Sequence, residues 1–108
     1  MKSHYEVSMG YELFMGKVFP GTFSNGKYSS GDLQSLIILE GGGYAPKLNY
    51  NKQLQKIKGN LFKGIDKLAK HAELSQWQSF ALELNQTDSA GEVANLCNKM
   101  LDYFHSNN

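Results

Sequence analysis

The sequence contains no arginine, and all eleven of its basic residues are lysines. Arginine is the side chain whose planar guanidinium binds phosphate or carboxylate through two parallel hydrogen bonds. It is also the commonest reader of guanine edges in DNA. Its absence therefore disfavours phosphoryl-transfer chemistry and sequence-specific recognition of DNA.

Cysteine is almost absent as well, because Cys97 is the only one. A lone cysteine cannot close an internal disulfide, and small secreted domains usually need several. No apolar run approaches the roughly 20 residues that a membrane-spanning helix needs. At the N-terminus, no hydrophobic segment follows Lys2, so the pattern differs from a secretory signal. We expect a cytoplasmic protein with no membrane partner.

The chain does have enough apolar material for one core. Of its 108 residues, 41% are hydrophobic and only 19% are charged, with a formal net charge of +1. The length is near the commonest domain size, and the composition lacks the signature of disorder. We expect a single domain over residues 1–108.

Two segments alternate in the manner of half-buried β-strands. In residues 5–15, the odd-numbered positions are Tyr5, Val7, Met9, Tyr11, Leu13 and Met15, all of them apolar or aromatic. In residues 77–84, the even-numbered positions include Phe80, Leu82 and Leu84. Between the first strand and the rest, Pro20–Gly21 predicts a turn and Asn25–Gly26 predicts a two-residue β-hairpin.

Residues 33–39 are apolar on both parities, which predicts a central strand buried on both faces and ended by Gly41–Gly43. A short helix that begins after Ser30 or Asp32 is the alternative. Periodicity does not separate the two over seven residues.

Two segments have helical periodicity. From about Asn51 to Leu74 the spacing of apolar residues is three or four, although Gly59 and Gly64 weaken this helix. Near the C-terminus, Ser89 precedes Glu92 by three residues, which is the pattern of a capping box at the start of a helix. With the strands, these helices predict an α+β fold: a mainly antiparallel sheet of about four to five strands with two amphipathic helices packed on one face.

No catalytic or metal-binding constellation is evident, and we expect neither enzyme activity nor a cofactor or metal. Cys97 lies on the apolar stripe of the last helix, where a thiol is usually inert. The histidines at positions 4, 71 and 105 are scattered and lack metal-ligand spacing. Gly41–Gly43 matches no phosphate-binding motif, since no Lys-Ser or Lys-Thr pair follows it.

Charge is segregated along the chain. Residues 47–72 hold seven lysines against Asp66 alone, a net charge of +6 in a chain that totals +1. Lys52, Lys56, Lys63, Lys67 and Lys70 lie opposite the apolar stripe of the helix. Such a basic face is either a solvated surface or a contact for an anionic partner. It supports an alternative function, non-specific RNA or DNA binding by the lysine-rich helix 51–72, with Tyr44, Tyr50 or Phe62 available for stacking.

The sheet face that the helices leave uncovered is the second candidate surface. If the strand parities are right, it presents Glu6, Glu12, Phe14, Trp77 and Glu83. Aromatic residues supply most hot-spot energy at protein interfaces, and charges steer the encounter. The leading hypothesis is therefore a non-enzymatic protein-binding domain, such as a small bacterial inhibitor or toxin-immunity protein that occludes the active site of a toxin or nuclease. A third hypothesis is a ligand-binding domain with a pocket near Gly41–Gly43, His71 and Glu40.

Overall fold

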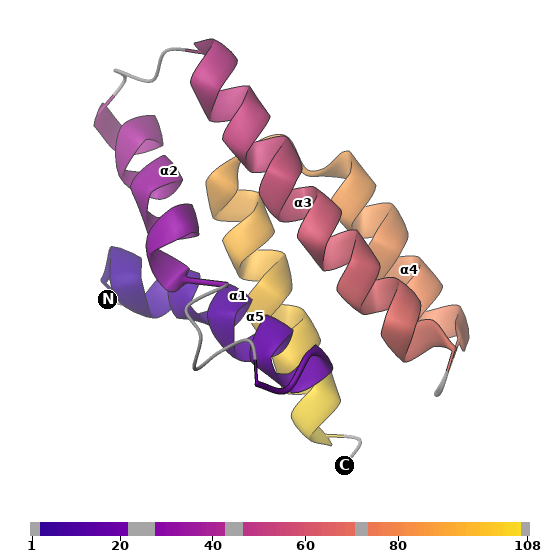
Figure 1. Cartoon of the computed structure of the whole chain (residues 1–108). Helices are drawn as coiled ribbons and strands as arrows, with labels where there is room; N and C mark the ends of the chain where they lie inside the picture. Colours follow the sequence, from indigo (N-terminus) through magenta and orange to yellow (C-terminus); the bar gives the residue numbers. More distant parts are fainter. Residues whose placement is uncertain (1–2, 22–27, 43–46, 71–73, 107–108) are drawn as a thin grey trace.

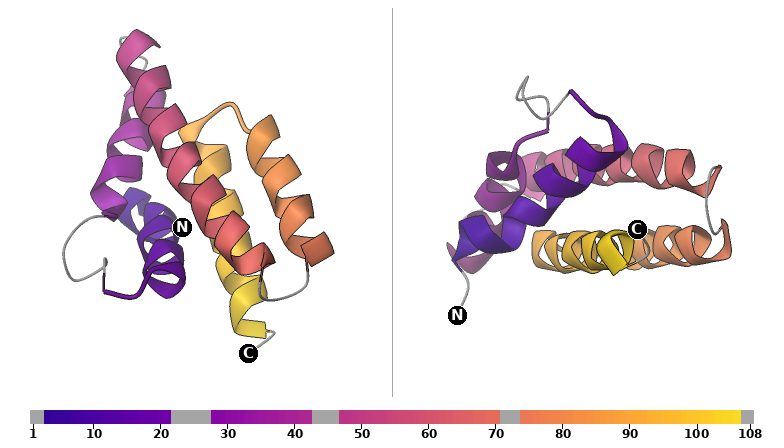
Figure 2. Two further views of the ribbon diagram at one scale, coloured as in Figure 1. Left: turned by 45° about the vertical axis from the view of Figure 1, so that its right-hand side comes forward. Right: turned by 90° about the horizontal axis from the view of Figure 1, so that it is seen from below.

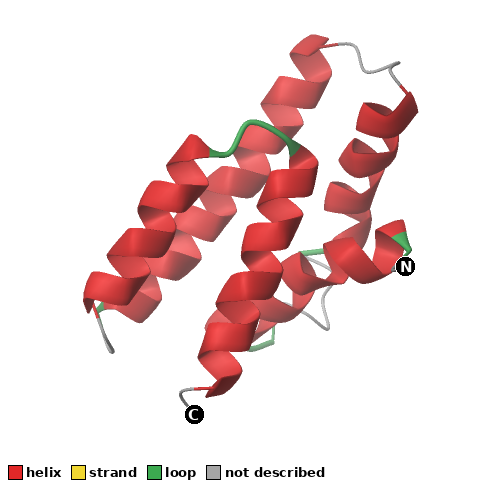
Figure 3. Ribbon diagram, turned by 180° about the vertical axis from the view of Figure 1, so that it is seen from behind, coloured by secondary structure: helices red, strands yellow, loops and turns green. Residues whose placement is uncertain are grey.

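The computed structural model describes residues 3–21, 28–42, 47–70 and 74–106, and in these ranges it contains helices and no strand (Figure 3). The five helices are α1 (His4–Val18), α2 (Ser30–Gly42), α3 (Lys47–Ala69), α4 (Leu74–Gln86) and α5 (Ala90–Ser106). The predicted α+β fold with an antiparallel sheet is therefore wrong. The predicted hairpin at Asn25–Gly26 lies outside the described residues.

The helices form a bundle in which α3, α4 and α5 run alternately down, up and down (Figure 1). Helix α1 packs against α5 and α2 and also contacts α3, whereas α4 contacts α3 and α5. Seen from below, α4 and α5 lie side by side in one layer, with α3 in a second layer above them (Figure 2). None of the described helices combines the length and the apolar character needed to cross a bilayer.

Residues 5–15, predicted as a strand, belong to α1. The helix begins with a capping box, because the Ser3 hydroxyl accepts from the Glu6 amide (3.1 Å) and the Glu6 carboxylate accepts from the Ser3 amide (2.9 Å). Its buried stripe is Tyr11, Phe14, Met15 and Val18, at helical spacings of three, one and three. Phe14 and Val18 fall on the other strand parity, so only a helix buries all four residues together.

Residues 33–39 belong to α2, so the strand prediction was wrong and the helical alternative, beginning near Ser30, is the one adopted. The Glu12 carboxylate of α1 accepts a hydrogen bond from the Ser30 amide (2.9 Å) and thereby caps the start of α2. Leu33 and Leu36 are buried one helical turn apart. Gly41 and Gly42 are the last residues of this helix rather than a stop to a strand.

Residues 77–84, predicted as the last strand, belong to α4. Trp77, Phe80 and Leu84 are buried at spacings of three and four, which is helical. Trp77 packs against Phe80 (ring centroids 5.2 Å apart) and against Tyr103 of α5 (5.4 Å). These aromatic contacts join α4 to the core.

The two predicted helices are present as α3 and α5, although α3 begins at Lys47 and ends at Ala69, and Leu74, the predicted end of the first, is instead the first residue of α4. At the start of α5 the Glu92 amide donates to the Ser89 hydroxyl (3.2 Å), as the capping pattern predicts. The Glu92 carboxylate accepts from the amide of Asp88 (2.7 Å) rather than from that of Ser89. The turn at Pro20–Gly21 is also present, with Gly21 at a φ of +96°, a conformation that favours glycine.

Candidate functional site

The acidic, aromatic surface expected on a sheet is not assembled. Phe14 and Trp77 are core residues, 0% and 3% exposed, with ring centroids 6.1 Å apart between α1 and α4. A side chain buried to this extent cannot contact a partner without unfolding of the core. These two aromatics therefore act in packing.

The three carboxylates expected on that surface make separate local contacts. Glu6 and Glu12 cap the starts of α1 and α2, as described above. Glu83 forms an ion pair with Lys99 (2.9 Å) across a groove of about 370 Å³ between the end of α4 and the first half of α5. Both partners of this pair are well exposed, so the pair adds little to stability.

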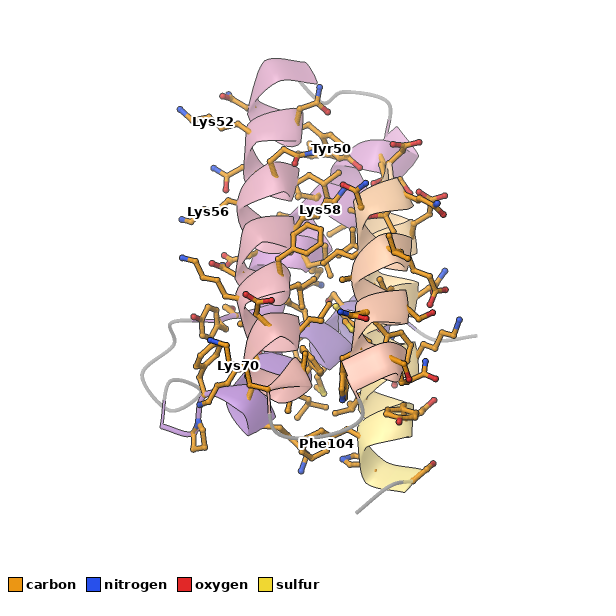
Figure 4. All side chains as sticks on the ribbon, turned by 90° about the vertical axis from the view of Figure 1, so that its right-hand side faces the viewer. Tyr50, Lys52, Lys56, Lys58, Lys70 and Phe104 are labelled. Carbon is orange, nitrogen blue, oxygen red and sulfur yellow. The ribbon has the colours of Figure 1, made fainter. Side chains whose placement is uncertain are left out.

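The basic surface, in contrast, is assembled on α3 and on Lys70, the residue directly after its end. Lys52, Lys56, Lys63, Lys67 and Lys70, named here the lysine face, are all exposed. At 3.6 residues per turn they fall within about 60° of the helix circumference, and they span about 27 Å along the axis. Figure 4 shows Lys52 and Lys56 projecting from the same side of the helix, away from α4.

Two lysines of this helix are engaged with the protein itself. The Lys67 ammonium donates to the carbonyl oxygen of Val18 (2.7 Å) and lies 4.8 Å from the centre of the Phe19 ring, so it holds the end of α1. Lys58, which is outside the lysine face, is buried and donates to the carbonyl oxygen of Thr87 (2.8 Å) after the end of α4. No ion pair within the described residues involves a member of the lysine face.

The described aromatic residues near α3 that were candidates for stacking, Tyr50 and Phe62, pack within the protein. Tyr50 donates from its hydroxyl to the Glu40 carboxylate and accepts from the Ala90 amide (2.9 Å), so it joins α3 to α2 and α5. Burial, and next the hydrogen bond to Glu40, raise the pKa of Tyr50 to about 12. Phe62 packs against the core, and Tyr44 lies outside the described residues. The predicted stacking role is thus unsupported for Tyr50 and Phe62.

A small polar cavity lies beside the lysine face, where α1, α2 and α3 meet. Its volume is about 70 Å³, and its lining consists of Tyr11, Asp32, Gln53, Lys56, Ile57 and Asn60. The Asn60 amide donates to the hydroxyl oxygen of Tyr11 (3.0 Å). Burial raises the pKa of Tyr11 to about 12, so this hydroxyl is protonated at neutral pH. Sequence reasoning missed this cavity because its residues come from three helices whose packing no local pattern reveals.

Within the described residues, the remaining candidates form no reactive or metal-binding site. Cys97 is fully buried, and burial raises the pKa of its thiol well above the usual range, which makes it unreactive. In the described part of the chain, no group of His, Cys, Asp and Glu side chains could hold a metal ion. Gly43 and His71, two residues of the hypothetical ligand pocket, lie outside the described residues, and Glu40 instead accepts from the Ala90 amide at the start of α5.

No protein-family model matches the chain, and neither a curated protein nor a solved structure is detectably similar to it, so its function is argued from its own residues.

Proposed function

We propose that this protein binds nucleic acid without sequence specificity, through phosphate contacts made by the lysine face of α3. The observation that carries the proposal is the alignment of four exposed lysines of α3 with Lys70, the residue that follows the helix, over about 27 Å. Successive members rise by about 4.5 to 10.5 Å along the axis, which is close to the Debye length at physiological ionic strength. Their potentials therefore overlap and favour a partner whose negative charges also form a row.

The composition of this face favours phosphate contact over base reading. Lysine is a compact point charge that binds a phosphate oxygen, and arginine, which reads guanine edges through two hydrogen bonds, is absent from the sequence. Phosphate contacts position a protein on nucleic acid but carry no sequence information. A cytoplasmic location, expected from the single cysteine, would give this face access to nucleic acid.

A membrane surface and an acidic protein are less suitable partners. A helix that lies on a membrane inserts its apolar face among the lipids, whereas the apolar stripe of α3, including Leu54, Leu61 and Ile65, is buried in the core. A protein interface usually centres on buried aromatic or aliphatic anchors. The positions beside the lysines are instead polar, among them Asn49 and Gln53.

The hypothesis of an inhibitor that occludes a partner's active site depended on an acidic, aromatic surface, and the described residues do not form that surface. Its two aromatic anchors, Phe14 and Trp77, lie in the core, and its carboxylates are engaged locally. An inhibitor or immunity function would need a different face of the molecule, so we do not carry it further.

The proposal is tested by removing two charges from the lysine face. We choose Lys52→Gln with Lys63→Gln, because both side chains are exposed and, unlike that of Lys67, neither donates to a carbonyl of another helix. Affinity for a labelled DNA duplex is measured by fluorescence anisotropy over a series of salt concentrations. If both lysines contact phosphates, the slope of log K against log salt falls in magnitude by about 1.8, since each phosphate contact contributes about 0.9.

The matched control is Lys17→Gln with Lys99→Gln, which changes the net charge equally but lies on α1 and α5. We expect this pair to leave the slope nearly unchanged. An equal loss in both double variants would show that net charge, and not the lysine face, attracts the nucleic acid. The absence of any binding by the unaltered protein at low salt would reject the proposal altogether.

A further inference from the structure

The cavity between α1, α2 and α3 is continuous with the lysine face, because Lys56 belongs to both. Gln53 and Asn60, which also line the cavity, lie within about 60° of Lys56 around the axis of α3. A strand whose phosphates lie on the lysine face would therefore pass the mouth of this cavity.

The size of the cavity limits what can enter it. At about 70 Å³ it is far smaller than the roughly 300–1,000 Å³ of pockets that take a whole small molecule. A cavity needs roughly 10–15 Å³ by this measure to hold one water molecule, so the cavity accommodates a small substituent such as a hydroxyl together with a few water molecules. The occupant is thus a small group carried by a larger ligand that remains outside.

The cavity wall offers both donors and acceptors of hydrogen bonds. The side chain of Tyr11 is only 1% exposed, and its hydroxyl accepts from Asn60, while its own proton has no acceptor among the described residues. Asp32 supplies a carboxylate acceptor, Lys56 an ammonium donor, and Gln53 an amide that does both. A phosphate group, which only accepts, would be repelled by Asp32. A hydroxyl group, which donates and accepts, matches the whole set.

We propose that this cavity receives the 2′-hydroxyl of a ribose, so that the protein prefers RNA to DNA. The 2′-hydroxyl is the group by which proteins distinguish the two at a given site. It also lies next to a backbone phosphate, which Lys56 would hold at the mouth of the cavity. This inference rests on the proposed function, since it assigns a sugar preference to the same surface.

The test compares labelled single-stranded oligouridylate with oligodeoxyuridylate of equal length, which differ only in the sugar. We expect the unaltered protein to bind the ribose form about 2- to 10-fold more tightly, the range for one net hydrogen bond. Asp32→Asn and Tyr11→Phe should each bring the affinity ratio close to one. The ratio is the readout because loss of the Asp32 charge alters the affinity for both strands.

Asp66→Asn is the control for Asp32→Asn. It also removes one negative charge, but from an exposed position on α3 that does not line the cavity. Its affinity ratio should equal that of the unaltered protein. Equal binding of the two strands by the unaltered protein would overturn the sugar preference and leave the proposed function standing. A preference for ribose that survives both cavity variants would overturn its assignment to this cavity, again without touching the proposed function. Failure to bind either strand at low salt would overturn both.

Discussion

Helices α1 and α3 differ in what surrounds their buried stripes. Around α1, neighbouring helices approach closely, and a Cβ built at Gly10 would lie 2.4 Å from Oδ1 of Asn98 in α5. On α3, a Cβ at Gly59 would meet nothing within 4 Å, and the exposed positions around it carry lysines and polar side chains. The α1 residues that face the core are thus determined by packing. The outer face of α3 is less constrained by packing. Of the lysine face, only Lys67 donates to a neighbouring helix within the described residues, and the phosphate contacts proposed above would account for the others.

The largest expected effect comes from truncating the core face of α1. Phe14→Ala should lower the free energy of unfolding by about 3–5 kcal/mol, because it removes a fully buried aromatic ring and leaves a cavity. Denaturant unfolding would measure this. Leu13→Ala, one residue away and 36% exposed, is the control and should cost less than about 1 kcal/mol. Similar losses in both variants would indicate that Phe14 is not a core residue.

A smaller effect is expected from adding a methyl group at the close contact between α1 and α5. Gly10→Ala should lower the free energy of unfolding by about 1–2 kcal/mol, because overpacking outweighs the gain in helix propensity. The side chain of Asn98, which must move, donates to the carbonyl oxygens of Val7 (2.9 Å) and Ala94 (3.0 Å).

A double-mutant cycle identifies the cause of that loss. In the background of Asn98→Ala the Gly10→Ala change should cost less, since the obstructing side chain is gone. If the cost of Gly10→Ala is the same in both backgrounds, the contact with the Asn98 side chain is not its source.

The smallest expected effect has the opposite sign. Gly59→Ala should raise the free energy of unfolding by about 1 kcal/mol, because alanine is the better helix former and its methyl group meets no neighbour. The midpoint of denaturant unfolding would report the change. A loss of stability would mean that the outer face of α3 is packed after all, which would remove the contrast with α1.

The strand predictions failed for a shared physical reason. Each depended on a large apolar side chain that is exposed on the outer face of a helix: Leu13 in α1, Ile38 in α2 and Leu82 in α4, at 36%, 50% and 66% exposure. Such residues complete an alternating or continuous apolar pattern without belonging to the core. The sequence did contain one signal for a helix at α1, because Ser3 and Glu6 have the same capping-box spacing as Ser89 and Glu92.

The sequence by itself determined the features that depend on one element. Helices α3 and α5 were predicted because their outer faces are polar, so helical periodicity was unambiguous. Lys52, Lys56, Lys63, Lys67 and Lys70 could be assigned to one face, because 3.6 residues per turn relates positions within a helix wherever that helix lies.

The tertiary structure decided everything that depends on contacts between helices. Phe14 and Trp77, predicted on a surface, lie in the core, and Lys58 is buried with its ammonium donating to the carbonyl oxygen of Thr87. The tertiary structure also brought Tyr11, Asp32 and Asn60 together around one cavity. The physical reason is that a helix with apolar residues on several sides can bury more than one of them. The choice among its faces is made by the helices packed against it.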